Sequence, residues 1–151
     1  MRKKLISILA ILLIIIIYLI FIYKPSFKVP DFEKEAKKYT ELKEMKPLEI
    51  KENYVVYIGK NIKIKNSVLS FYLASAKNNN VYIKCRVYEE NKIIGETGLI
   101  KPGEYIEKIK LKKILAEKVT IKIMGYDIKT YQSTGSVKFE VQVKKWKNIY
   151  L

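Results

Sequence analysis

The 151-residue sequence has no histidine and only one cysteine, Cys85. Histidine is the usual proton shuttle near neutral pH and the commonest metal ligand, so hydrolytic triads that use it are excluded. A single cysteine cannot form an intramolecular disulfide, so cysteine pairing says nothing about the redox compartment. No nucleophile, phosphate-binding or metal-binding motif is present. We therefore expect no catalytic residue, no cofactor and no metal ligand, and a protein that is not an enzyme.

Acidic residues are scarce, with 15 Asp and Glu against 30 Lys and Arg. Three of the basic residues lie in the first four positions, so 27 follow them and exceed the acids by 12. Such an excess attracts polyanions, including acidic wall polymers and anionic lipid headgroups. The alternative is that the lysines only solvate the surface. We favour this interpretation because the lysines alternate along strands and do not form one dense block. We expect no specific nucleic-acid partner.

Residues 5–23 form an unbroken apolar run, LISILAILLIIIIYLIFIY. As a helix this run is roughly 28 Å long, close to the ~30 Å hydrocarbon thickness of a bilayer. Bulky residues at its end argue against cleavage as a signal peptide. We expect a retained single transmembrane helix that contacts membrane lipid. The basic tail of residues 1–4 favours a cytoplasmic N-terminus, although lysines soon after the run weaken that bias.

Residues 24–47 form a predicted linker. Pro25 and Pro30 favour an extended spacer. Asp31 can cap a short juxtamembrane helix that ends near Met45, because apolar residues then recur at intervals of three and four. These residues are Phe32, Ala36, Tyr39 and Leu42.

Residues 48–144 change to a period of two. Seven or eight short strands are predicted, from the ranges 55–58, 61–65, 68–74, 81–89, 93–97, 105–111, 119–127 and 136–144. One-sided alternation is typical of antiparallel sheets with one packed face and one wet face. The strand number predicts an all-β fold, an Ig-like antiparallel β-sandwich, although the Cys-Trp-Cys signature of antibody domains is absent and a barrel stays open. Residues 145–151 form a predicted C-terminal tail.

The segment 81–89 carries the candidate site. Its alternation places Cys85 inward among aliphatic residues as a buried structural thiol. The outward residues are Tyr82, Lys84, Arg86 and Tyr88, and they join the exposed Tyr72 in a candidate polyanion-binding face. Aromatic and basic side chains together can stack on a polymer and neutralise it. The alternative is that the tyrosines form cross-strand pairs that stabilise the wet face of a sheet.

Gly98 to Gly103 is the most specific local motif, of the form Gly-x-Ile-x-Pro-Gly. Pro102 and Gly103 fit the central positions of a type II turn. With Asn80 and Gly125-Tyr126, within residues 62–143, this motif resembles a group of small Gram-positive membrane-anchored proteins of uncharacterised function. The resemblance implies an extracytoplasmic β-sandwich with its N-terminus inside, and it transfers no catalytic residue.

Together these features predict a non-enzymatic binding or assembly module at the cell envelope. Its expected partners are membrane lipid, through the apolar run, and an envelope protein or acidic polymer. The alternative function is that of an accessory subunit in a secretion or DNA-transfer machine.

Overall fold

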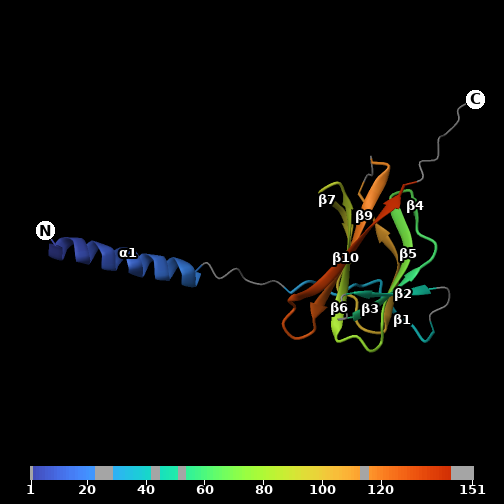
Figure 1. Ribbon diagram of the computed structural model, residues 1–151, viewed down its shortest axis with the longest axis horizontal. Coiled ribbons are helices and arrows are strands. Elements are labelled where there is room, and N and C mark those ends of the chain that lie inside the picture. Colours follow the sequence, from blue (N-terminus) through green and yellow to red (C-terminus); the bar gives the residue numbers. More distant parts are fainter. Residues whose placement is uncertain (1, 23–28, 42–44, 51–53, 113–115, 144–151) are drawn as a thin grey trace, which may run out of the picture.

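The computed structural model describes residues 2–22, 29–41, 45–50, 54–112 and 116–143. In these residues one helix is followed by ten strands (Figure 1). The elements are α1 (Arg2–Ile22), β1 (Lys37–Lys38), β2 (Met45–Ile50), β3 (Tyr54–Gly59), β4 (Lys63–Lys65), β5 (Val68–Ser75), β6 (Val81–Glu89), β7 (Lys92–Glu96), β8 (Glu104–Lys110), β9 (Lys118–Asp127) and β10 (Ser133–Gln142).

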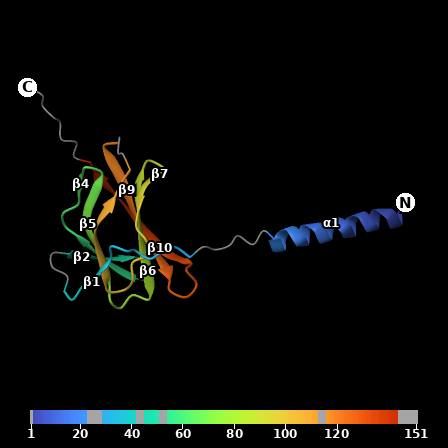
Figure 2. The ribbon, with the colours of Figure 1, turned by 180° about the vertical axis from the view of Figure 1, so that it is seen from behind.

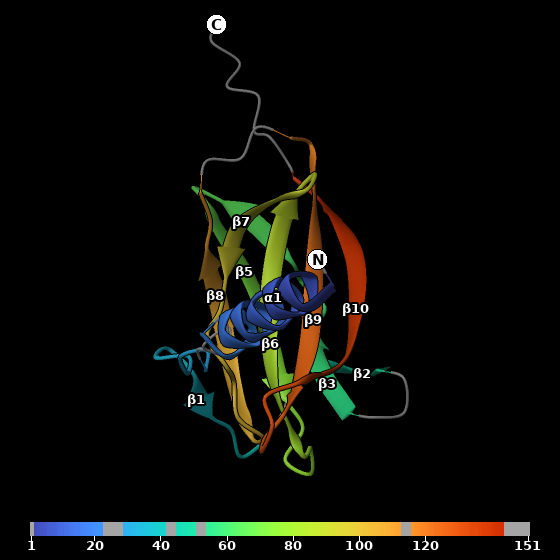
Figure 3. The ribbon, with the colours of Figure 1, turned by 90° about the vertical axis from the view of Figure 1, so that its left-hand side faces the viewer.

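The described strands form two antiparallel sheets. The six-stranded sheet has the order β1-β8-β5-β3-β2, with β4 also paired to β5. The four-stranded sheet has the order β10-β9-β6-β7. Figure 3 looks onto the four-stranded sheet, with strands of the other sheet behind it. Figure 2 shows the molecule from behind the view of Figure 1. An all-β fold of antiparallel sheets is thus confirmed.

The core lies between the two sheets because alternating residues of each strand point toward the other sheet. Val56, Leu69 and Leu73 come from the six-stranded sheet, and Ile83 and Ile121 from the four-stranded one, and all five are fully buried. Cys85 is also fully buried among them, which confirms the predicted buried thiol. Each of the eight ranges that alternation predicts contains a strand. β6 has the predicted bounds, and the ends of the other strands shift by up to three residues. β1 and β2 were not predicted.

The predicted helix at residues 31–45 is wrong. Residues 31–39, which we name the strap, lie along the sheet domain without helix, with a turn at residues 34 and 35 between the bridge at Phe32 and β1. Leu99 N donates to Asp31 O and Glu33 N donates to Leu99 O, each at 2.9 Å, and β1 then pairs with β8. The backbone groups that a helix would satisfy internally are satisfied by a neighbouring chain segment instead. Phe32 and Ala36, two of the apolar residues that suggested a helix, pack on the domain. Leu42 lies outside the described residues.

The turn after Ile100 follows the prediction. Gly103 has a φ of +79°, the left-handed region in which glycine carries no steric penalty. Glu104 N donates to Lys101 O at 3.0 Å and closes the turn. Pro102 and Gly103 therefore connect the end of the Gly98 segment to β8.

Helix α1 lies apart from the two sheets (Figure 1). Its described large apolar side chains are between 47% and 66% exposed. Among the residues that the structure describes, no helix is long and apolar enough to cross a membrane. The predicted spacer at 24–28 and the tail at 145–151 lie outside the described residues.

Candidate functional site

The four candidate residues share one side of β6, but their surroundings differ. Tyr82, Arg86 and Tyr88 are partly exposed, whereas Lys84 is only 8% exposed. The expectation that Lys84 is a wet surface residue is therefore wrong. Tyr72 belongs to β5 in the other sheet, where its ring stacks on Tyr105 at a centroid distance of 6.1 Å. The structure thus does not bring Tyr72 to the candidate face.

Lys84 is covered because the chain beyond β7 runs close beside it. Thr97 N donates to Cys85 O at 3.0 Å, and Cys85 N donates to Thr97 Oγ1 at 2.9 Å. These bonds hold residues 97 and 98 against β6. Residues 29–31, together with residues 96–98, line the pocket that contains Lys84. Alternation along β6 predicts which side chains point outward, but it does not predict that another chain segment covers Lys84.

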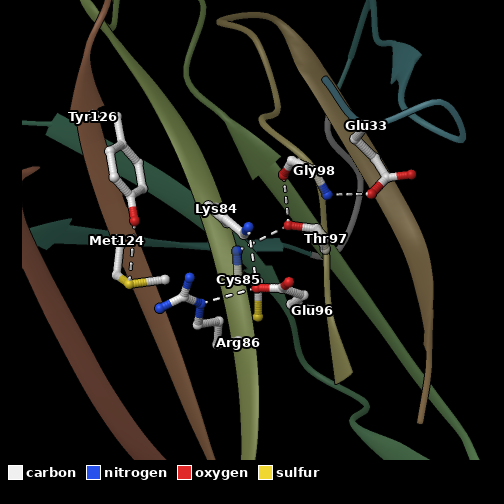
Figure 4. A network of polar contacts seen from close by, with 9 residues as sticks. All are labelled: Glu33, Lys84, Cys85, Arg86, Glu96, Thr97, Gly98, Met124 and Tyr126. Carbon is white, nitrogen blue, oxygen red and sulfur yellow. Dashed lines mark hydrogen bonds and ion pairs between the residues drawn. The ribbon is translucent and has the colours of Figure 1, made fainter. Parts of the chain in front are cut away.

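Both cations of β6 bind the same carboxylate. Lys84 Nζ lies 3.1 Å from Glu96 Oε2, and Arg86 Nε lies 3.0 Å from the same atom (Figure 4). Partial burial alone would raise the pKa of Glu96, but the hydrogen bonds and charges of Lys84 and Arg86 outweigh it and lower the pKa. For Arg86, burial alone would lower the pKa, and contacts with Glu96 and Tyr88 raise it instead. Glu96 is therefore a stable anion that neutralises part of the predicted site.

The sheet register adds two cations that the candidate set lacked. Lys122 of β9 lies directly opposite Arg86, and Lys138 of β10 lies directly opposite Lys122. We name Arg86, Lys122 and Lys138 the basic row. Lys122 is partly exposed and Lys138 is exposed, and within the described residues neither forms an ion pair. Like charges directly opposite one another destabilise a sheet, so a bound anion would relieve repulsion along this row.

Tyr82 is used in packing. The Phe32 ring of the strap and the Tyr82 ring pack edge to face with centroids 5.1 Å apart, and the centroid of the Tyr131 ring lies 5.9 Å from that of Tyr82. Lys101 Nζ lies 4.6 Å from the centre of the Phe32 ring. Tyr82 therefore anchors the strap. Tyr88 remains beside Arg86, at the side of the basic row.

The described residues show no cluster of three or more His, Cys, Asp or Glu side chains that could hold a metal ion. Burial strongly raises the pKa of the Cys85 thiol, so this thiol stays protonated and unreactive. The arrangement can bind an anion through fixed charges and hydrogen-bond donors.

The sequence matches no protein-family model, and no curated protein or solved structure matches the chain. The candidate site is thus defined by its own geometry.

Proposed function

We propose that the protein is a single-pass membrane-anchored module whose extracytoplasmic β-sandwich binds an acidic phosphodiester polymer of the cell envelope. The observation that carries the binding proposal is the basic row, in which Lys122 has a cation opposite it on each side. A linear polyanion laid across β6, β9 and β10 would contact all three cations in turn. Such binding is non-enzymatic.

The anchor proposal has two supports. The apolar run at 5–23 has the length of a bilayer crossing and lacks charge. The described apolar side chains of α1 are about half exposed, so the sheets do not cover them. A continuous apolar surface of this kind is costly in water and favours burial in lipid. The basic residues at positions 2–4 favour an inside N-terminus and an extracytoplasmic domain, as the resemblance also implies.

The strand order supports an Ig-like sandwich. The order β3-β5-β8 faces β10-β9-β6-β7, which corresponds to strands A-B-E and G-F-C-C′ of Ig-like domains. The place of strand D, beside E, is taken by β1, which comes from the N-terminal strap. In this proposal the strap completes the sandwich and joins it to the anchor.

The binding test uses the full chain in detergent micelles and polyglycerol phosphate as the probe. Replacing Lys122 and Lys138 together by Gln should weaken binding about tenfold or more. The slope of log affinity against log salt should also fall by roughly 0.7 to 0.9 for each lost phosphate contact. The matched control replaces Lys63 and Lys65, two exposed lysines of β4 in the other sheet, and makes the same change in net charge. Equal losses in both variants would contradict the basic row as the site.

The anchor test is protease added to intact, wall-stripped cells. The proposal expects the β-domain to be digested while residues 5–23 stay in the membrane fraction. A domain protected until lysis would reverse the topology, and recovery of the intact chain outside the membrane fraction would refute the anchor.

A further inference from the structure

β10 is an open edge of the four-stranded sheet. It is ten residues long, and among the described residues only β9 pairs with it. Figure 3 shows β10 at the outer margin of the sheet. An edge strand has a row of unpaired backbone donors and acceptors and can accept another strand.

The other sheet edges are less suited to pairing. β7 has five residues and a register shift opposite Val87 and Tyr88. β2 contains Pro47, which has no N–H to donate. The edge of β8 is partly covered by β1. By contrast, β10 pairs with β9 without a register shift from Ser136 to Gln142, and it has no proline there.

Hydrogen bonding to β9 fixes which groups of β10 face outward. Val143 N donates to Glu117 O at 2.7 Å, and the same register pairs Gln142 with Lys118. Successive residues of a strand turn their backbone groups to opposite sides. Odd-numbered residues from 137 to 143 therefore bond to β9. The residues whose N–H and C=O groups face the open edge are Ser136, Lys138, Glu140 and Gln142.

We propose that β10 pairs antiparallel with β10 of a second copy of this chain, with the two-fold axis at Phe139. In this register Lys138 faces Glu140 of the second copy, and Ser136 faces its Gln142. On the core side Val137 faces Val141, and Phe139 faces itself. Every facing pair therefore matches in character, with opposite charges or polar groups on the outer face and apolar groups on the inner face.

The backbone geometry fits the same register. The four even-numbered residues face one another in four pairs, and each pair can exchange two backbone hydrogen bonds. Lys138 is exposed and has no ion pair among the described residues. Glu140 forms an ion pair with Lys118 at 3.0 Å, and both side chains are more than half exposed. The Glu140 carboxylate can therefore also form an ion pair with Lys138 of the second copy.

The proposed interface is only one strand wide, whereas stable complexes bury about 1,200 to 2,000 Å². Dimerisation is therefore weak in dilute solution and is strengthened where the local concentration is high. Cross-linking captures such a weak and specific contact better than a size measurement.

The first test mixes two full-length variants in detergent micelles, Lys138→Cys and Glu140→Cys, under mild oxidation. In the proposed register these positions form a hydrogen-bonded pair with Cα atoms about 5.5 Å apart, within disulfide range. Two copies of one variant place their cysteines about 8 to 9 Å apart, beyond that range. Cys85 is fully buried and does not compete. The mixture should cross-link at least tenfold faster than either variant alone, and equal rates would refute the register.

The second test exchanges charges and reads self-association by energy transfer between donor- and acceptor-labelled chains in micelles. Lys138→Glu alone, and Glu140→Lys alone, place like charges opposite each other and should lower transfer. The double variant restores opposite charges and should restore transfer. Thermal unfolding of each variant separates a loss of folding from a loss of pairing. The proposal would be overturned if the folded single variants showed as much energy transfer as the natural chain.

Discussion

The rings of Phe32 and Tyr82 pack edge to face, with their centroids 5.1 Å apart and an angle of 89° between their planes. Phe32 belongs to the strap that leads from the N-terminal helix, and Tyr82 lies on β6 two residues from Lys84. The strap is also bonded to the chain after β7, because Gly98 N donates to Glu33 Oε2 at 2.7 Å. One end of the candidate face is thus joined through the strap to the chain that follows α1.

Replacing Phe32 by Ala should loosen the strap without unfolding the sheets. The ring is 38% exposed, so the loss should be smaller than for a core phenylalanine, about 1 to 2 kcal/mol of unfolding free energy. Urea unfolding measures this loss. Hydrogen exchange should show faster exchange at Glu33 and Leu99 N–H groups, with protection in β9 unchanged. Uniform loss of protection across both sheets would contradict a local role.

Gly98→Ala tests how closely the strap approaches the domain. A Cβ atom at this position would lie 2.5 Å from Glu33 N and 2.6 Å from the carbonyl carbon of Phe32. Both are backbone atoms, so the strap must move. We expect a loss of the Glu33–Leu99 and Leu99–Asp31 hydrogen bonds, seen as fast amide exchange at residues 33 and 99.

The matched control is Gly103→Ala. Gly103 has a positive φ but open space around it, with only the Lys77 side chain within 4 Å. Its substitution should lower the unfolding free energy by about 1 kcal/mol through backbone strain. Because Gly103 O accepts from Tyr39 N, at the far end of the strap, the amides of residues 33 and 99 should stay protected. If both variants expose the amides of residues 33 and 99 equally, Gly98 has no special role in holding the strap.

The strands were predictable because alternation is a local property of the chain. In β6 and β9, apolar residues at every second position mark the buried face directly. The strap was not predictable in the same way, because its apolar residues recur at helical intervals while its backbone groups bond to Leu99 and β8. Spacing reports which side chains are buried, and it does not report which backbone partner is available.

The candidate site depended on pairing, which alternation does not contain. Lys122 and Lys138 could be assigned to outward faces from their own strands. That they line up with Arg86 depends on strand order and register, both set by the packed core. Tyr72 shows the converse error, since it is outward and aromatic but lies in the other sheet.

Glu96→Gln should make the protein less stable and its stability less dependent on pH. Lys84 is nearly buried, so the loss of its carboxylate partner should lower the unfolding free energy by about 1 to 3 kcal/mol at pH 7. The folded-state pKa of Glu96 lies below its ordinary value of 4.5, so this carboxylate stabilises the fold above pH 4.5. That contribution disappears as the pH falls through the lowered pKa, and the natural chain and the variant should converge there.

Urea unfolding at pH 7, 5, 4 and 3 measures the convergence, and Glu140→Gln is the matched control. Its partner Lys118 is more than half exposed, so that change should cost no more than about 1 kcal/mol at pH 7. A difference between Glu96→Gln and the natural chain that stays constant down to pH 3 would contradict the ionic role of Glu96.

The same variant should act on polymer binding in the opposite direction. Glu96 holds Arg86 Nε at 3.0 Å and offsets part of the charge of the basic row. Its neutralisation frees the guanidinium, so folded Glu96→Gln should bind polyglycerol phosphate more tightly than the natural chain, with a steeper dependence on salt. Titration of the folded variant with polyglycerol phosphate at pH 7 and several salt concentrations measures the affinity and its dependence on salt. An affinity that falls together with stability would mean that Glu96 organises Arg86 for binding, and that the row needs the carboxylate.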